Sequence, residues 1–199
     1  MDGFRYYAVF IDDYSRFTWF YPMKAKSDFY NILASFMALV QTQFSSKIEV
    51  FQSDGGTEFK NSRVRELFNT NGTQQNGRVE GNHRHVTETG LAMMFNAHAP
   101  ANLWTHAFSS TAYIINRLPT KLLGNQSPYE MLFSSTPNYG NFRVFGCCVF
   151  PYLRDYSSYK LAPRSTPCLF IGYNTQYKGY QCLDPSTGRV YITRHTQFD

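Results

Sequence analysis

The sequence predicts an α/β domain followed by a small all-β module, and three observations lead to that prediction. Near the start, two strand-like runs at 6–11 and 18–23 are joined by a polar turn. Between residues 27 and 133, several segments carry apolar residues at the three-and-four spacing of amphipathic helices. After residue 142 the period changes, and short strand-like runs replace the helices. We therefore expect a sheet covered by helices first and a small barrel second.

The first predicted elements are a hairpin and a helix. The turn between the first two strands begins with Asp12 and Asp13, and we interpret this pair as turn residues and not as catalytic ones, because aspartate is common in turns. Ser27 is expected to cap the helix that follows. The apolar residues of that helix share one face: Phe29, Ile32, Leu33, Phe36 and Val40.

A carboxylate stands at the end of the third predicted strand. Lys47 to Phe51 contains the β-forming residues Ile48 and Val50, and the run stops at a glycine pair. Asp54 therefore lies at the carboxyl end of a strand, where open α/β sheets place ligands and reactive groups. Taken alone, Asp-Gly-Gly is also an ordinary turn signal, so both interpretations stay open at this point.

Two helical patterns follow this strand. A short helix begins at Asn61, and Gly72 is placed to close it. A longer pattern runs from Arg78 to Ala97 and carries Glu80 in its first turn. The polar stretch between the two helices is predicted to be a loop.

The remaining helices have clear ends. A helix is predicted over 102–118, where Pro119 forces its end. Ser127-Pro128-Tyr129-Glu130 combines a capping box with proline at the first helical position, so a short helix should run to Phe133. The segment 137–141 is a predicted linker.

The second module is predicted from its short strands. These strands are expected at 144–152, 168–173, 180–183 and 190–193. Asp184-Pro185-Ser186-Thr187-Gly188 is predicted to be the turn between the last two. Strands at this density indicate a small barrel.

The composition is that of a folded protein outside the membrane. Hydrophobic residues make up 43% and aromatic residues 18% of the 199 residues, which is enough for a packed core. No apolar run could cross a bilayer and no secretory leader follows Met1, so we expect an intracellular, soluble protein with no membrane partner.

The positive charge is concentrated in the second half. Residues 1–100 carry ten Lys or Arg and ten Asp or Glu, whereas residues 101–199 carry nine and four, for a net charge of +5. This asymmetry favours a polyanionic partner. A basic solvated surface is the alternative, since many ordinary proteins carry as much charge.

The four cysteines are predicted to be reduced thiols of the core. They show no C-x-x-C spacing and no paired histidines at zinc-finger distance. Each lies in an apolar or aromatic run: Cys147, Cys148, Cys168 and Cys182. Such thiols pack as small apolar side chains, and we prefer this interpretation to a metal site.

Four motifs occur along the chain in an order that is found in one known family. They are Phe10-Ile11-Asp12-Asp13-Tyr14-Ser15-Arg16, Gln52-Ser53-Asp54-Gly55-Gly56-Thr57-Glu58-Phe59, Gln74-Gln75-Asn76-Gly77-Arg78-Val79-Glu80 and Arg143-Val144-Phe145-Gly146-Cys147. Together they resemble the integrase of copia-type long-terminal-repeat retrotransposons, and the resemblance covers nearly the whole chain. It implies an RNase H-like catalytic core, 1–136, followed by an SH3-like β module, 142–199.

The resemblance also implies a chemistry, DNA integration by metal-dependent polynucleotidyl transfer. Asp54 and Glu80 match the second and third carboxylates of the family, which hold two Mg²⁺ or Mn²⁺ ions. If both bind one metal pair, their carboxylates should lie within about 12 Å of each other. The implied partner is DNA, a functional protein would act in the nucleus, and a homo-oligomer stays open. The residues expected to bind nucleic acid are Arg78, Arg84, Arg143, Lys160, Arg164 and Lys178.

Two departures from the family lead us to expect an inactive chain. Only 25 residues separate Asp54 from Glu80, whereas the resembled integrases have about ten more, and the shortfall falls near 72–73. The fifth strand of the family's sheet is expected to be absent there. The first strand, with the first catalytic Asp, has no match in this sequence. We therefore expect a truncated, internally deleted integrase with an interrupted sheet and a weak thermal transition.

Two alternatives to this interpretation stay open. A nucleic-acid-binding remnant would use the basic second half without catalysis, and its affinity for DNA would fall steeply with salt. A purely structural relic would show neither DNA binding nor cooperative folding.

Overall fold

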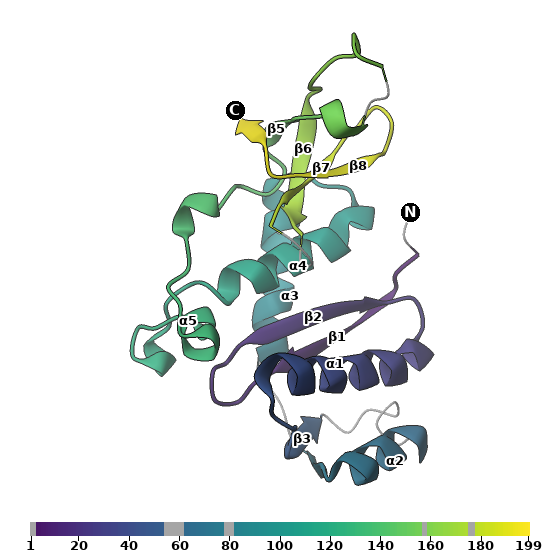
Figure 1. The fold of residues 1–199 in the computed structure, drawn as a ribbon, viewed down its shortest axis with the longest axis vertical. Helices are drawn as coiled ribbons and strands as arrows, with labels where there is room; N and C mark the ends of the chain where they lie inside the picture. Colours follow the sequence, from purple (N-terminus) through teal and green to yellow (C-terminus); the bar gives the residue numbers. More distant parts are fainter. Residues whose placement is uncertain (1–2, 54–61, 78–81, 157–158, 175–177) are drawn as a thin grey trace. The chain divides into compact units, whose positions relative to one another are not determined.

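The computed structural model describes residues 3–53, 62–77, 82–156, 159–174 and 178–199. Figure 1 shows the elements of this mixed α/β fold. The strands are β1 (Tyr6–Ile11), β2 (Thr18–Met23), β3 (Val50–Ser53), β4 (Gln74–Gly77), β5 (Cys148–Pro151), β6 (Cys168–Tyr173), β7 (Tyr180–Leu183), β8 (Val190–Thr193) and β9 (Thr196–Phe198). The helices are α1 (Phe29–Phe44), α2 (Ser62–Asn71), α3 (Asn82–Asn96), α4 (Trp104–Ile115) and α5 (Pro128–Phe133). Short 3-10 turns are η1 (Lys26–Asp28), η3 (Ala101–Leu103), η4 (Lys121–Leu123), η5 (Tyr139–Asn141) and η6 (Arg154–Tyr156).

The chain forms two compact units. The first unit comprises residues 1–9 and 20–84, and the second comprises residues 10–19 and 85–199. Apolar side chains are buried in each of them, for example Leu33 in the first and Phe170 in the second. The domain boundaries expected from the sequence, 1–136 and 142–199, stay a prediction.

The predicted hairpin is confirmed, with β1 and β2 at the expected residues. Its turn is organised by Asp12, whose carboxylate accepts hydrogen bonds from the backbone N–H and the hydroxyl of Ser15 at 2.8 and 2.6 Å. Asp13 pairs with Arg16 instead. The interpretation of both aspartates as turn residues is therefore confirmed.

The start of α1 differs from the prediction. Ser27 does not cap the helix, because it lies inside η1, and α1 begins at Phe29. The Asp28 carboxylate accepts the backbone N–H groups of Lys24 and Ala25 and so holds the approach to the helix. The buried face contains Phe29, Leu33, Phe36 and Met37. Ile32 and Val40 are half-buried at its margin.

The third strand is shifted toward the carboxyl end of the chain relative to its prediction. It was expected at Lys47–Phe51, but β3 covers Val50–Ser53. Its ring contact is between Phe51 and Phe68 of α2, with the ring centroids 5.0 Å apart. Because β3 ends at Ser53, the predicted strand directly precedes Asp54.

The absence of a further strand after Gly72 was predicted wrongly. Gln74–Gly77 forms β4 and pairs in parallel with β3. Gly72, with a φ of +70°, closes α2 as predicted and turns the chain. The Thr73 hydroxyl then donates to the Ile48 carbonyl and the Gln74 N–H donates to the Glu49 carbonyl, both at 2.7 Å. These two bonds align the polar segment with β3. The segment has no hydrophobic pattern from which a strand could have been predicted.

The expectation of an interrupted sheet is confirmed in the described residues. β1 and β2 form one two-stranded sheet, and β3 and β4 form another. No hydrogen-bonded strand joins the two sheets within that part of the chain.

The helices of the second unit are shorter than their patterns predicted. In the described residues α3 covers Asn82–Asn96, and its predicted start at Arg78 lies outside them. α4 begins at Trp104, after η3, and ends at Ile115, three residues before the predicted end. The capping box of α5 is confirmed, since Ser127 and Glu130 exchange side-chain and backbone hydrogen bonds.

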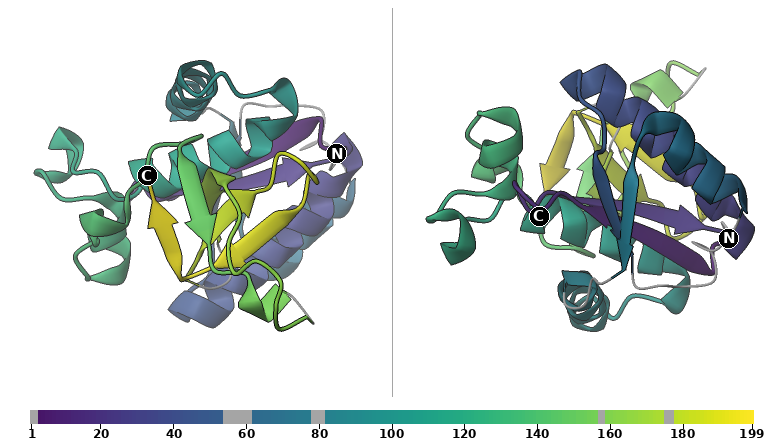
Figure 2. Two further views of the ribbon diagram at one scale, coloured as in Figure 1. Left: turned by 90° about the horizontal axis from the view of Figure 1, so that it is seen from above. Right: turned by 90° about the horizontal axis from the view of Figure 1, so that it is seen from below.

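The second unit contains the five-stranded antiparallel sheet, in the order β8-β7-β6-β5-β9. Seen from above, its strands cross one another and do not lie in one flat layer (Figure 2), as expected for a small barrel. The bounds of β6, β7 and β8 are confirmed. The strand predicted at 144–152 is reduced to β5, because Gly146 adopts a φ of +83° and Cys147 turns back to Val144. β9 was not predicted.

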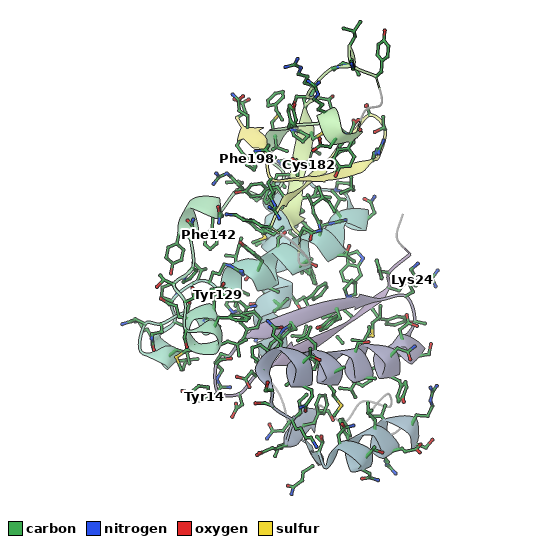
Figure 3. All side chains as sticks on the ribbon, viewed as in Figure 1. Tyr14, Lys24, Tyr129, Phe142, Cys182 and Phe198 are labelled. Carbon is green, nitrogen blue, oxygen red and sulfur yellow. The ribbon has the colours of Figure 1, made fainter. Side chains whose placement is uncertain are left out.

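Helix α4 packs against β6 of this sheet. Gly172 allows the close approach, because a Cβ built there would lie 2.5 Å from the Ser110 hydroxyl oxygen. One turn farther on, the rings of Tyr113 and Tyr173 stack with centroids 3.8 Å apart. Tyr113 and Ile114 extend the core formed by the buried strand residues, among them Cys182, which Figure 3 labels.

Candidate active site and nucleic-acid interface

The candidate catalytic edge is built by the two parallel strands of the first unit. The last pair in their register is Ser53 of β3 and Gly77 of β4, so both strands end at the same edge. Asp54 follows Ser53 directly in the sequence, and Glu80 follows Gly77 by three residues. Asp54, Glu80 and Arg78 all lie outside the described residues, and the approach of the two carboxylates stays a prediction.

Four of the predicted nucleic-acid-binding residues have exposed side chains. They are Arg84 on α3, Lys160 and Arg164 in the connection from β5 to β6, and Lys178 just before β7. Three of the four belong to the segment predicted as the SH3-like module. Exposure makes these side chains accessible to a phosphate backbone, and their nucleic-acid contacts stay a prediction.

Arg143 has a different environment from these four residues. Its guanidinium donates to the carbonyl oxygens of Gly140 and Phe142 at 2.7 and 2.6 Å. The same group lies 4.6 Å from the ring centroid of Phe198, and Figure 3 labels Phe142 and Phe198. The backbone N–H of Arg143 also donates to the Tyr173 hydroxyl at 3.0 Å. These contacts are typical of a residue that holds β9 and the start of the module in place.

Two residues at the end of α4 were missed by the sequence reasoning. The buried Asn116 side chain accepts the Thr18 N–H at 2.8 Å and donates to the Thr18 carbonyl at 2.7 Å. The Arg117 guanidinium lies 3.5 Å from the ring centroid of Tyr113 and 4.7 Å from that of Tyr129. Burial lowers the pKa of Arg117, and the neighbouring tyrosines oppose that shift. Asn116 falls four residues after Ala112, on the buried face of the helix. A polar residue at a buried position needs a hydrogen-bond partner, and this was the signal in the sequence that could have identified Asn116.

The cysteines behave as core thiols where they are buried. All four are free, and Cys168 and Cys182 are buried. Burial raises the pKa of Cys168 to about 11 and that of Cys182 to about 12. Both thiols therefore stay protonated at neutral pH, which makes them poor nucleophiles and poor metal ligands.

No cluster of three or more His, Cys, Asp or Glu side chains suited to a metal ion occurs in the described part of the chain. The carboxylates predicted to bind metal, Asp54 and Glu80, fall outside that part. Nor does any helix in the described residues have the length and apolar character needed to span a membrane.

Comparison with known proteins assigns two segments of the chain to protein families. Residues 1–82 match the family "Integrase core domain". Residues 147–199 match the family "Retroviral polymerase SH3-like domain". The class of protein is therefore an integrase core followed by an SH3-like domain, as the fold class predicted.

Relatives cover the whole chain. It is 41% identical over 208 residues to the Retrovirus-related Pol polyprotein from transposon RE1 of Arabidopsis thaliana, covering 100% of this chain and 14% of that protein. It is also 41% identical to the Retrovirus-related Pol polyprotein from transposon RE2 of the same plant, covering 100% of this chain and 14% of that protein. Its identity to the Retrovirus-related Pol polyprotein from transposon TNT 1-94 of Nicotiana tabacum is 31%, covering 100% of this chain and 16% of that protein.

The chain belongs to the integrase family of copia-type retrotransposon Pol polyproteins. It spans about a seventh of the length of these relatives. The match to the RE1 polyprotein runs over 208 residues, nine more than the 199 of this chain. Integrase cores are in general divalent-metal dependent and bind DNA.

Proposed function

We propose that this chain is a DNA-binding integrase segment whose Asp54 and Glu80 serve as two of the carboxylates for polynucleotidyl transfer. We further propose that the 199-residue chain is inactive by itself, because its sequence offers no match for the first carboxylate of the family. In the parent polyprotein the reaction would be DNA integration, which takes place in the nucleus. Self-association, as in integrases, would be measured on the same samples by light scattering.

The observation that carries this proposal is the register of β3 and β4. Paired residues of neighbouring strands lie about 4.8 Å apart, and Ser53 is paired with Gly77. Asp54 is one position after Ser53 in the sequence, and Glu80 is three positions after Gly77. Since each residue spans at most about 3.6 Å, the two Cα atoms cannot be more than about 20 Å apart. The expected carboxylate separation of at most about 12 Å is compatible with this bound.

The chemistry of the two side chains fits a divalent metal. Carboxylate oxygens are hard ligands of the kind that Mg²⁺ and Mn²⁺ prefer, and Asp54 and Glu80 would hold the ions. When bound, such ions activate the attacking water or 3′-hydroxyl and stabilise the leaving oxygen. Two carboxylates alone leave the pair of ions incompletely held.

The proposal is tested by strand-transfer assays with Mg²⁺ or Mn²⁺. The purified chain should not join DNA ends, whereas a longer segment of the same polyprotein that supplies a further carboxylate should join them. In that longer protein, Asp54→Asn and Glu80→Gln should each abolish joining. Joining by the 199-residue chain would show that another of its residues completes the site. Undiminished joining by either variant would remove that residue from the site.

A second function, nucleic-acid binding without catalysis, is favoured by the charge distribution. Residues 101–199 carry nine basic and four acidic side chains. We propose that this half supplies most of the affinity for DNA. Fluorescence anisotropy with a labelled duplex should give an affinity that falls steeply with salt. Binding that is absent at low salt, or that does not depend on salt, would contradict this proposal.

A further inference from the structure

Two arginines flank the strand at one end of the five-stranded sheet. Arg189 directly precedes β8 and Arg194 directly follows it, and both side chains are exposed. β8 is the terminal strand in the order β8-β7-β6-β5-β9. The two arginines are five positions apart in the sequence, which corresponds to about 16 Å along an extended strand.

Arg189 is held by two tyrosine rings. Its guanidinium lies 5.1 Å from the ring centroid of Tyr191 and 5.6 Å from that of Tyr156. The two rings meet edge to face, with centroids 5.1 Å apart. The Tyr156 hydroxyl donates to the Ile192 carbonyl at 2.7 Å and accepts the Ile192 N–H at 3.0 Å. Because Tyr156 is fixed to the strand, the guanidinium is oriented before any ligand binds.

Arg194 is oriented by a different contact. Its Nε donates to the Lys178 carbonyl at 2.8 Å. This bond fixes the plane of the guanidinium and leaves its two terminal nitrogens for other partners. The exposed Lys178 side chain adds a second positive charge at this end of the strand.

Neither arginine of this edge has a carboxylate partner within ion-pair distance among the described residues. The Asp184 carboxylate is occupied by hydrogen bonds from Ser186 and Thr187.

A second exposed arginine lies near the Arg189 end of the strand. Arg154 belongs to η6, the turn that also carries Tyr156. The acidic group on that turn is Asp155, which is exposed. Four exposed basic side chains thus flank β8 or belong to segments that contact it: Arg154, Lys178, Arg189 and Arg194.

A peptide strand is a poor occupant for this edge. Strand addition needs unpaired backbone N–H and C=O groups, and Tyr156 already occupies both groups of Ile192. Recognition must therefore use side chains. Two oriented guanidinium groups suit phosphate oxygens, which they can bind through paired N–H donors.

We propose that the edge of β8 is the docking strip for a nucleic-acid backbone, with Arg189 and Arg194 as its two anchors. This inference rests on the proposed DNA-binding function, and it assigns the principal contacts to residues other than Lys160 and Arg164. A span of about 16 Å corresponds to about five nucleotides of one strand along the helix axis, since each strand carries a charge every 3.4 Å.

The test compares two double variants of the full chain that lose the same charge. Arg189→Gln with Arg194→Gln should weaken binding to a labelled 20-base-pair duplex by at least about 5-fold and reduce the salt slope by about 2. Lys160→Gln with Arg164→Gln should have a smaller effect on both quantities. Equal losses for the two variants would overturn the assignment. Absence of salt-dependent binding by the unsubstituted chain would instead overturn the proposed function.

A single substitution tests whether orientation matters in addition to charge. Arg189→Lys keeps the positive charge but loses the planar group that stacks on Tyr156 and Tyr191, so binding should weaken by about 3-fold at constant salt slope. Unchanged affinity would show that only net charge acts at this edge. Far-ultraviolet circular dichroism of each variant should match that of the unsubstituted chain, and a variant that does not match is replaced by the corresponding Met substitution.

Discussion

The two compact units differ in how their sheets are completed. In the described part of the first unit, β3 pairs with β4 alone, and two-stranded sheets are marginally stable by themselves. In the second unit, five strands form one sheet, and Val149, Phe170 and Cys182 at its centre have no exposed surface. Cooperative stability should therefore come mainly from the second unit.

The comparison also separates binding from catalysis. Asp54 and Glu80 belong by sequence to the first unit, whereas residues 101–199, with nine basic and four acidic side chains, belong to the second. Loss of the catalytic geometry therefore need not remove DNA binding. The weak thermal transition that we expect from the sequence should be confined to the first unit, while the second unit should unfold cooperatively.

The strongest test of this comparison deletes one buried phenylalanine from each unit. Phe170 is 0% and Phe68 is 2% exposed. Phe170→Ala should cost about 3–5 kcal/mol and remove the main thermal transition, whereas Phe68→Ala should leave that transition in place. Near-ultraviolet circular dichroism during heating measures both effects. Loss of the main transition in both variants would mean that the chain unfolds as one unit.

Two separate glycine substitutions, one a test and one a control, probe the packing of α4 on the sheet of the second unit. Gly172→Ala should destabilise by about 2–4 kcal/mol, because its positive φ is strained for alanine and the added methyl meets the Ser110 hydroxyl. Gly188 has a φ of +71° with nothing within 4 Å of a built Cβ, so Gly188→Ala should cost only about 1 kcal/mol. Urea unfolding measures the difference, and equal costs would contradict the close approach of α4.

The clamp between Asn116 and Thr18 is expected to have an intermediate effect. Asn116→Ala leaves the Thr18 N–H and carbonyl without their partners in a buried site, and should cost about 2 kcal/mol. Asn138 also bonds a backbone N–H, that of Gly140, but is exposed. Asn138→Ala should cost about 0.5 kcal/mol. A smaller loss for Asn116→Ala than for Asn138→Ala, measured by urea unfolding, would show that the clamp does not hold the hairpin.

Acid should weaken the second unit through two hydrogen-bonded carboxylates. Hydrogen bonds from Ser186 and Thr187 lower the pKa of Asp184 from 3.8, and bonds from Ser127 lower the pKa of Glu130 from 4.5. Because the folded-state pKa is depressed, the stabilisation is present above these ordinary values and is lost as the pH falls through the lowered pKa.

This acid sensitivity is the smallest of the expected effects. Asp184→Asn should flatten the dependence of Tm on pH below 3.8, the ordinary pKa of that carboxyl. Asp155→Asn, on the exposed η6 turn, is the charge-matched control and should leave the dependence nearly unchanged. A steep acid loss that persists in the Asp184 variant would assign the effect to other groups.

Local signals were enough for a large part of the second unit. The capping box at Ser127 and the strands β6, β7 and β8 occur where the sequence predicted them, because each is encoded within a few adjacent residues. The hairpin β1–β2 is local in the same sense. The candidate catalytic residues were found by motif, and the end of β3 directly before Asp54 agrees with the expected context.

The sequence by itself determined the family, the hairpin, the helical faces and most strands of the SH3-like module, since these depend on periodicity and on short motifs. Only the tertiary structure decided the features that depend on residues far apart in the chain. Polar Gln74–Gly77 became β4 because Ile48 and Glu49 offer carbonyl acceptors to it. Arg143 lies against Phe198 and not in a free loop, and Gly172 meets Ser110 of α4. Such long-range contacts produce no periodic pattern in the sequence. Each one depends on a backbone group or a ring that a distant segment supplies.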